Sequence, residues 1–192
     1  MKKQIIPVAL ILTILTHGLF AGPFGLEMGM TIDEIDTNAT EISPGVYKLS
    51  KVPKPHSAFE SYIVQVGPQS GLGWLKAIGK DIQTSVYGSS LKSEFEDLKS
   101  KIEKVYGAGV TRDTLLPGSI WDEPKDFMMA LRKKERLLFT AWEKPKNSDN
   151  IVQVGLIASA TGTDSGYLSL EYSFENEEKV EQEISALEDD AF

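Results

Sequence analysis

Residues 167–174 read Tyr-Leu-Ser-Leu-Glu-Tyr-Ser-Phe and alternate large apolar side chains with polar ones. One side of this stretch holds Leu168, Leu170, Tyr172 and Phe174, and the other holds Ser169, Glu171 and Ser173. Successive side chains of a β-strand point to opposite faces of the sheet, so the alternation predicts a strand with one buried face. Residues 61–66 alternate in the same way, with Tyr62, Val64 and Val66 on the apolar side. The two stretches predict an antiparallel sheet that is covered on one face.

Further patterns surround these two strands in a regular order. Strand patterns occur in two groups of three, at residues 46–52, 61–66 and 73–82, and at residues 137–143, 151–159 and 167–174. Helix patterns occur at residues 31–38, 91–106 and 122–134 and again after residue 175, whereas residues 107–119 are predicted to be a loop. Runs of consecutive strands with helices outside them predict an α+β fold, with the helices on one face of the sheet.

The segment 91–106 gives the clearest helix signal. Its apolar residues recur at the spacing of one helix face, namely Leu91, Phe95, Leu98, Ile102 and Val105, and Gly107 is placed to end the helix. Earlier in the chain, Thr31 and Glu34 have the spacing of a capping box, in which each side chain accepts the other residue's backbone N–H. We expect the long helix to pack on the apolar face of the sheet.

A five-residue segment occurs twice in the chain. Ile-Val-Gln-Val-Gly is found at residues 63–67 and again at 151–155, in the middle strand of each predicted group of three. This recurrence predicts that residues 22–192 form one domain built from two tandem units, residues 22–89 and 90–192. Each unit would contain a helix and three antiparallel strands.

The first 21 residues have the pattern of a secretory signal peptide. Lys2 and Lys3 precede an apolar run at residues 5–15, and Ala21 supplies a small residue for cleavage. The run is shorter than the ~20 residues that a membrane-spanning helix needs. We predict an exported protein, periplasmic or secreted, that is cleaved after Ala21. N-terminal sequencing of the exported protein should find Gly22 first, and retention of Lys2 would contradict the prediction.

Composition excludes several classes of function. A net charge of −8 disfavours nucleic acid and anionic membranes as partners. The chain has no cysteine, so thiol catalysis, thiolate metal sites and lipid attachment through cysteine are excluded, and no second apolar run predicts a transmembrane segment. With His56 as the one histidine after residue 21, we expect no bound metal and no cofactor. A small secreted hydrolase stays open as an alternative, using a Ser/His pair with His56 or carboxylates such as Glu60, Asp81 and Glu171.

The sheet face opposite to the predicted core holds the candidate binding residues. The strand alternation places Gln65, Trp74, Lys76, Trp142, Gln153, Tyr167 and Glu171 on this face. Protein interfaces are rich in aromatic side chains. We therefore predict a non-catalytic module that binds another envelope or extracellular protein through Trp74, Trp142, Tyr167, Gln65 and Gln153. On this prediction, Trp142→Ala weakens partner binding and leaves the melting temperature almost unchanged.

Residues 24–35 also carry a resemblance. Phe24-Gly25-Leu26, followed by Gly29-Met30-Thr31 and then Glu34-Ile35, resembles the start of small envelope proteins of the SmpA/OmlA (BamE-like) type. The element order is similar to that of β-lactamase-inhibitor proteins. The resemblance implies an exported, non-enzymatic protein that binds proteins through its sheet side. The missing lipid-acceptor cysteine departs from the SmpA/OmlA pattern.

Overall fold

The structure is a computed structural model that describes residues 22–146, 148 and 150–189. The predicted signal peptide, residues 1–21, lies outside the described residues. The strands are β1 (Thr40–Ser43), β2 (Val46–Leu49), β3 (Phe59–Gly67), β4 (Gly71–Gly79), β5 (Ile82–Gln83), β6 (Val110–Leu115), β7 (Arg136–Glu143), β8 (Ile151–Ala160) and β9 (Ser165–Phe174). The helices are α1 (Ile32–Ile35), α2 (Ser89–Tyr106), α3 (Phe127–Arg132) and α4 (Glu177–Asp189), with short 3₁₀ turns η1 (Pro23–Gly25) and η2 (Pro124–Asp126).

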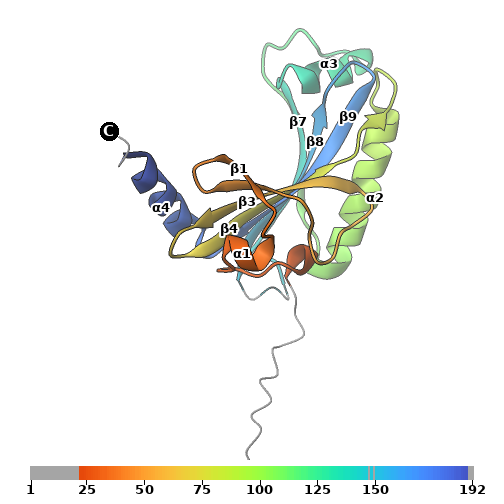
Figure 1. Cartoon of the computed structure of the whole chain (residues 1–192). Coiled ribbons are helices and arrows are strands. Elements are labelled where there is room, and N and C mark those ends of the chain that lie inside the picture. The colour runs from red at the N-terminus through yellow and green to blue at the C-terminus, as the bar shows by residue number, and fades with distance from the viewer. Residues whose placement is uncertain (1–21, 147, 149, 190–192) are drawn as a thin grey trace, which may run out of the picture.

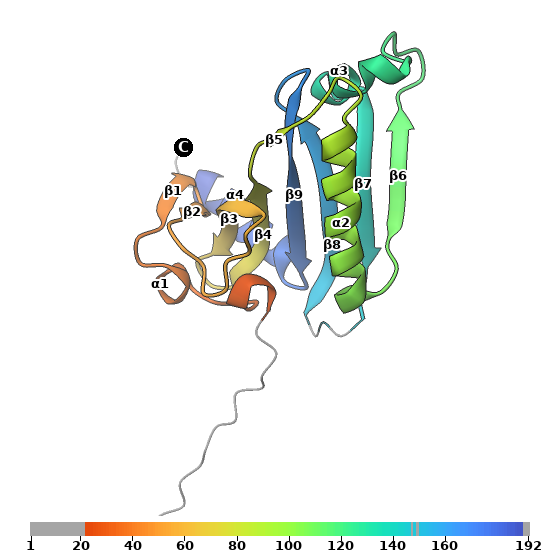
Figure 2. The same ribbon diagram turned by 90° about the vertical axis from the view of Figure 1, so that its right-hand side faces the viewer.

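Within the described residues, the strands form one nine-stranded antiparallel sheet. Its order is β1-β2-β3-β4-β9-β8-β7-β6, and the short β5 also pairs with β9. The two predicted groups of three strands therefore meet edge to edge through their last strands, β4 and β9. Figure 2 shows the result, in which β1–β4 form one wing and β6–β9 the other. The predicted α+β fold with an antiparallel sheet is confirmed.

The hydrophobic core lies on one face of the sheet, under α2 and α3. Helix α2 packs on β5, β8 and β9 with its predicted stripe, of which Leu91, Phe95, Leu98 and Ile102 are buried. The fifth predicted member, Val105, is 53% exposed, because the buried stripe continues from Ile102 to Tyr106, whose ring packs against Tyr172. From the sheet, β8 and β9 contribute Val154, Leu156, Leu168, Leu170 and Tyr172, as their alternation predicts. We call this the core face.

Helix α4 packs on the opposite face, which corrects the prediction that the helices share one face. Its Val180 is buried against Gly67 and Gly73, close to the turn between β3 and β4. Glu183 accepts hydrogen bonds from the backbone N–H groups of Gln69 and Ser70, each at 3.0 Å. Glycine lacks a Cβ, so α4 approaches the strands closely at these two positions. Figure 1 shows α2 and α4 on opposite sides of the sheet.

The segment before β1 closes the core at the wing of β1–β4. Phe24 packs its ring edge-on against Phe59, Tyr62 and Tyr172, with centroids 5.5, 4.9 and 6.1 Å away. Helix α1 starts with the capping box that the sequence predicts, because Thr31 and Glu34 accept each other's backbone N–H. This packing fixes the N-terminal segment beside β3.

Strand β6 lies within residues 107–119, where the sequence predicts a loop, so that prediction is wrong. β6 pairs with β7 alone, and five of its six residues are exposed. An edge strand is held by backbone hydrogen bonds and does not need an apolar face. It therefore lacks the alternation by which the inner strands are recognised.

The repeated pentapeptide lies on both middle strands, but at different ends of them. Gly67 pairs with Gly71 and is the last residue of β3 before the β3–β4 turn. In β8 the last residue before the turn to β9 is Ala160, which pairs with Gly166, and Gly155 lies five residues before it. Val64 and Val66 are both buried in β3, and in β8 Val154 is buried while Val152 is partly exposed. The letters repeat, but their register in the sheet does not.

Candidate binding face of the sheet

The face opposite to the core face carries a continuous set of side chains, most of them partly exposed, which we call the open face. The strand register places on it Ile63, Gln65, Trp74, Lys76, Ile78, Phe139, Ala141, Gln153, Gly155, Ile157, Tyr167, Ser169, Glu171 and Ser173. These residues alternate with buried core residues along each strand, because successive side chains point to opposite faces. The open face therefore extends over β3, β4, β9, β8 and β7.

Three of the five predicted binding residues share one row of this face. Gln65 pairs with Trp74, Trp74 pairs with Ser173, and Ser173 pairs with Gln153. The row crosses β3, β4, β9 and β8, so Trp74 and Ser173, which lie 99 positions apart in the sequence, become direct neighbours. Residues directly opposite on neighbouring antiparallel strands have Cβ atoms about 5 Å apart. Trp74 can pack against a partner, and the side-chain amides of Gln65 and Gln153 at the two ends of the row can form hydrogen bonds with it.

Tyr167 lies on the same face at the other end of β9. Its partner in β8 is Ser159, and the next strand along this row, β7, contributes Leu137, which is 48% exposed. Between the Tyr167 row and the Trp74 row, β9 contributes Ser169 and Glu171. The structure therefore places Tyr167 on the predicted face but not in contact with the row of Trp74.

Trp142 is not on the open face, which corrects the prediction that the strand alternation places it there. It is 3% exposed and lies on the core face with Leu138 and Thr140. Its indole Nε1–H donates a 2.8 Å hydrogen bond to the carbonyl of Gly107, the residue that ends α2. A Cβ at Gly109 would lie 2.6 Å from the indole, so glycine is needed for this approach. Strand β7 has apolar residues on both faces, so its sequence does not decide which face is buried.

The centre of the open face is shallow and has one ion pair. Lys76 and Glu171 are paired across β4 and β9 with their charged atoms 2.7 Å apart. Beside them, Gly155 and Ala141 are paired on β8 and β7, and a Cβ at residue 155 would meet no atom within 4 Å. The space above Gly155, between the row of Trp74 and the row of Ile157, is therefore open.

Sequence reasoning missed three apolar members of this face. Ile78, Ile157 and Phe139 lie in one row with the buried Ser169, and each of the three is partly exposed. Their positions follow from the register with β9, where the alternation is clear. The alternation of apolar and polar residues in β9 shows which of its side chains face away from the core. Once the strand pairing is known, the residues opposite them in β4, β8 and β7 can be assigned to the same face.

Helix α4 borders the open face at its Trp74 end. Burial raises the pKa of Glu177 above its ordinary value, and the carboxylates of Glu181 and Glu171 act in the same direction, while a hydrogen bond from Ser173 opposes them. The backbone of Glu177 lies at the Trp74 end of β4, where a Cβ built at Gly73 would be 3.2 Å from the Glu177 Cα. This contact gives the open face a charged boundary on that side.

The candidate catalytic residues of the alternative hydrolase function lie in separate environments. His56 is in the turn before β3, where its backbone N–H donates to Tyr62 Oη at 3.2 Å and its Nδ1 accepts the N–H of Ala58 at 3.1 Å. Glu60 is exposed, Asp81 accepts hydrogen bonds from Gln83 and Thr161, and Glu171 is paired with Lys76. In the part of the chain that the structure describes, no three His, Asp or Glu residues are grouped so as to hold a metal ion.

No helix among the described residues has both the length and the apolar character to cross a membrane. Comparison of the chain with protein-family models, with curated proteins and with solved structures finds no match.

Proposed function

We propose that this chain is an exported, non-catalytic protein that binds another envelope or extracellular protein through the open face. The observation that supports the proposal is the continuity of this face across five strands, with Trp74, Phe139 and Tyr167 partly exposed on it. Rigid aromatic side chains with hydrogen-bonding neighbours are the typical composition of protein interfaces.

The placement of the helices leaves this face available for a partner. Helices α2 and α3 pack on the core face, and α4 covers the open face mainly at β3 and β4, close to the turn between them. Phe139 of β7, Ile157 of β8 and Tyr167 of β9 are therefore left partly exposed, and an exposed apolar patch of this kind is typical of an interaction site. A partner that covers Phe139, Ile157 and Tyr167 would bury apolar area at roughly 25 cal/mol per Å².

The finer organisation of the fold belongs to the same proposal. We infer that β2–β3–β4 and β7–β8–β9 are tandem units, with boundaries at residues 22–89 and 90–192, because the two groups meet through their last strands. The order of these elements along the chain is similar to that of β-lactamase-inhibitor proteins. This arrangement joins two small sheets into one open face large enough for a protein partner.

The open face is tested by crosslinking at Gly155, where a new side chain has free space. A photoreactive residue at position 155 should capture a discrete partner from envelope extract, because its side chain projects from the centre of the face. The same residue at Lys104, which is exposed on α2 on the other side of the sheet, is the control. Equal capture from both positions would contradict the proposal.

Trp74→Ala and Tyr167→Ala test the energy of the same surface. Each should weaken binding of the captured partner about 30-fold, which corresponds to the ~2 kcal/mol typical of an interface hot spot. The melting temperature should change little, since both residues are partly exposed. Surface plasmon resonance with the purified partner measures the first effect and thermal unfolding the second. Unchanged affinity in both variants would rule out this face.

A further inference from the structure

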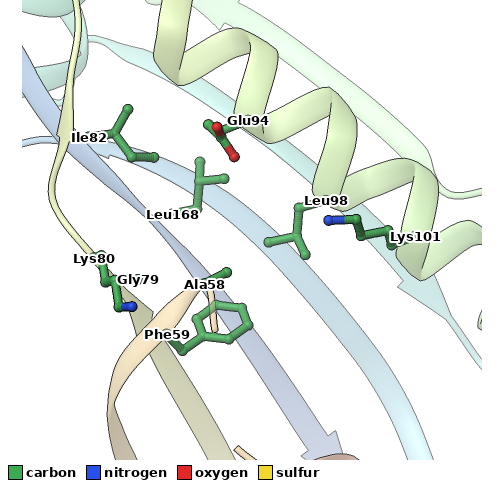
Figure 3. Close-up of a pocket in the computed structure, with 9 residues that line it drawn as sticks. All are labelled: Ala58, Phe59, Gly79, Lys80, Ile82, Glu94, Leu98, Lys101 and Leu168. Atoms are coloured by element: carbon green, nitrogen blue, oxygen red, sulfur yellow. The ribbon is translucent and has the colours of Figure 1, made fainter. Parts of the chain in front are cut away.

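A hollow of about 200 Å³ lies on the core side, between α2 and the start of β3. Its apolar wall is made by Phe59, Ile82, Leu98 and Leu168, and its rim carries Lys80 and Lys101. Figure 3 shows Leu98, Lys101 and Glu94 on α2 facing Phe59 and Leu168 across the hollow. The opening exists because α2 packs on β5, β8 and β9, while Ala58 and Gly79 leave little side-chain volume beside β3.

A second hollow of about 170 Å³ continues from the first along α2. The two share Phe59, Leu98 and Lys101 in their linings, so they adjoin along α2. The second part runs between Phe24 and Tyr106, over Leu170 and Tyr172. Small-molecule sites have volumes of roughly 300–1,000 Å³, and the two hollows reach this range only when they are taken together. We call these two adjoining hollows together the α2 groove.

The polar groups at the α2 groove favour an anion at its rim. Lys80 and Lys101 are exposed, and among the described residues neither has a carboxylate oxygen within 4.0 Å of its ammonium. His56 lines the second hollow, and its Nδ1 accepts a backbone N–H, which leaves Nε2–H as a donor in the neutral ring. Glu94 is the one carboxylate that lines the groove in the described part of the chain. With two lysines and one glutamate, the charged side chains that line the groove are net positive, although the whole chain has a net charge of −8.

We propose that the α2 groove binds a free, unbranched alkyl carboxylate, with its chain along Phe59, Leu98 and Leu168 and its carboxylate at Lys101. An extended groove with an apolar wall fits an alkyl chain, and Lys101 lies where the two hollows meet. A carboxylate there forms a charge-assisted hydrogen bond with the ammonium. The groove is on the opposite side of the sheet from the open face, so this activity is separate from the proposed protein binding.

Sodium dodecanoate, titrated below its micelle concentration, tests the proposal by calorimetry. We expect saturable binding of one molecule per chain. Affinity should rise about fourfold for each methylene added from octanoate to dodecanoate, until the groove is filled. Dodecyltrimethylammonium should bind at least tenfold more weakly, because its cationic head meets lysines. The absence of saturable binding, or equal binding of the cation, would overturn the proposal.

Two variants locate the binding in the groove. Ala58→Phe should abolish it by filling the first hollow, and Lys101→Gln should weaken it about tenfold. Lys104→Gln, an exposed residue of α2 that does not line either hollow, is the matched control and should leave affinity unchanged. If Ala58→Phe lowers the melting temperature, the comparison of Lys101→Gln with Lys104→Gln still decides, and equal affinities of those two variants would contradict the assignment.

Two further measurements distinguish alkyl carboxylate binding in the α2 groove from protein binding at the open face and from binding to a membrane surface. Trp74→Ala should leave dodecanoate affinity unchanged, so failure of the open face and failure of the groove are distinguishable. Phosphatidylglycerol vesicles should not sediment the protein, because the groove is proposed to take a free monomer. Sedimentation with vesicles without binding of monomeric dodecanoate would identify a membrane surface instead and overturn the proposal.

Discussion

Trp142→Ala should lower the free energy of unfolding by about 4 kcal/mol, as replacement of a large buried aromatic residue by alanine generally does. The indole is 3% exposed and donates a hydrogen bond to the Gly107 carbonyl, so the substitution leaves both a cavity and an unpaired carbonyl. Chemical denaturation followed by circular dichroism measures the change. This outcome is the opposite of the almost unchanged stability that the sequence alone predicts for this variant.

Two matched variants separate the contributions to this effect. Trp74→Ala removes the same side chain from the other face of the same sheet, and we expect a loss of less than about 1.5 kcal/mol because Trp74 is partly exposed. Trp142→Phe keeps most of the packing and removes the hydrogen bond, which predicts an intermediate loss of about 2 kcal/mol. Equal losses for Trp74→Ala and Trp142→Ala would contradict the placement of the two faces.

Asp36→Ala should cost about 3 kcal/mol, because this buried carboxylate connects α1 to the residues after β2. Its Oδ2 accepts the backbone N–H and hydroxyl of Ser50, at 2.6 and 2.7 Å, and the N–H of Lys51 at 3.3 Å. Its Oδ1 accepts the N–H of Asn38 at 3.0 Å. Removing the acceptor leaves these donors without a partner, at about 1–3 kcal/mol for a buried group. Thermal unfolding should show less than 1 kcal/mol for the control Asp33→Ala, which is exposed in α1.

The same carboxylate makes stability depend on pH. The hydroxyl of Ser50 and three backbone N–H groups lower the pKa of Asp36 from 3.8 to about 2, against the opposing effect of burial. A lowered pKa in the folded state means that the unfolded chain binds the proton more readily. The contribution of Asp36 is therefore complete above about pH 4 and is lost as the pH falls towards 2. Asp36→Asn should flatten the stability curve in this range, and an unchanged slope would contradict the assignment.

The sequence predicts strands correctly where the alternation is strong and helices where one face is apolar. Residues 167–174 lie in β9 with their apolar side buried, and four of the five predicted stripe residues of α2 are buried. It fails at β6, whose residues are stabilised by pairing with β7 and do not need apolar alternation. Of the candidate binding residues, Gln65, Trp74, Gln153 and Tyr167 lie on the open face, and Trp142 does not.

The sequence by itself determined the α+β class, the core side of β3, β8 and β9, and the capping box of α1. These features depend on residues that are close together in the chain, so the spacing of apolar and polar side chains specifies them. The tertiary structure alone decided the side of Trp142, the placement of α4 and the existence of the α2 groove. Each depends on the meeting of distant segments: Trp142 bonds to Gly107, Val180 packs on Gly67 and Gly73, and Leu98 faces Phe59 across the hollow. The spacing of apolar and polar residues within a strand does not depend on which distant segment packs on that strand. The sequence therefore contains no local pattern that predicts these contacts.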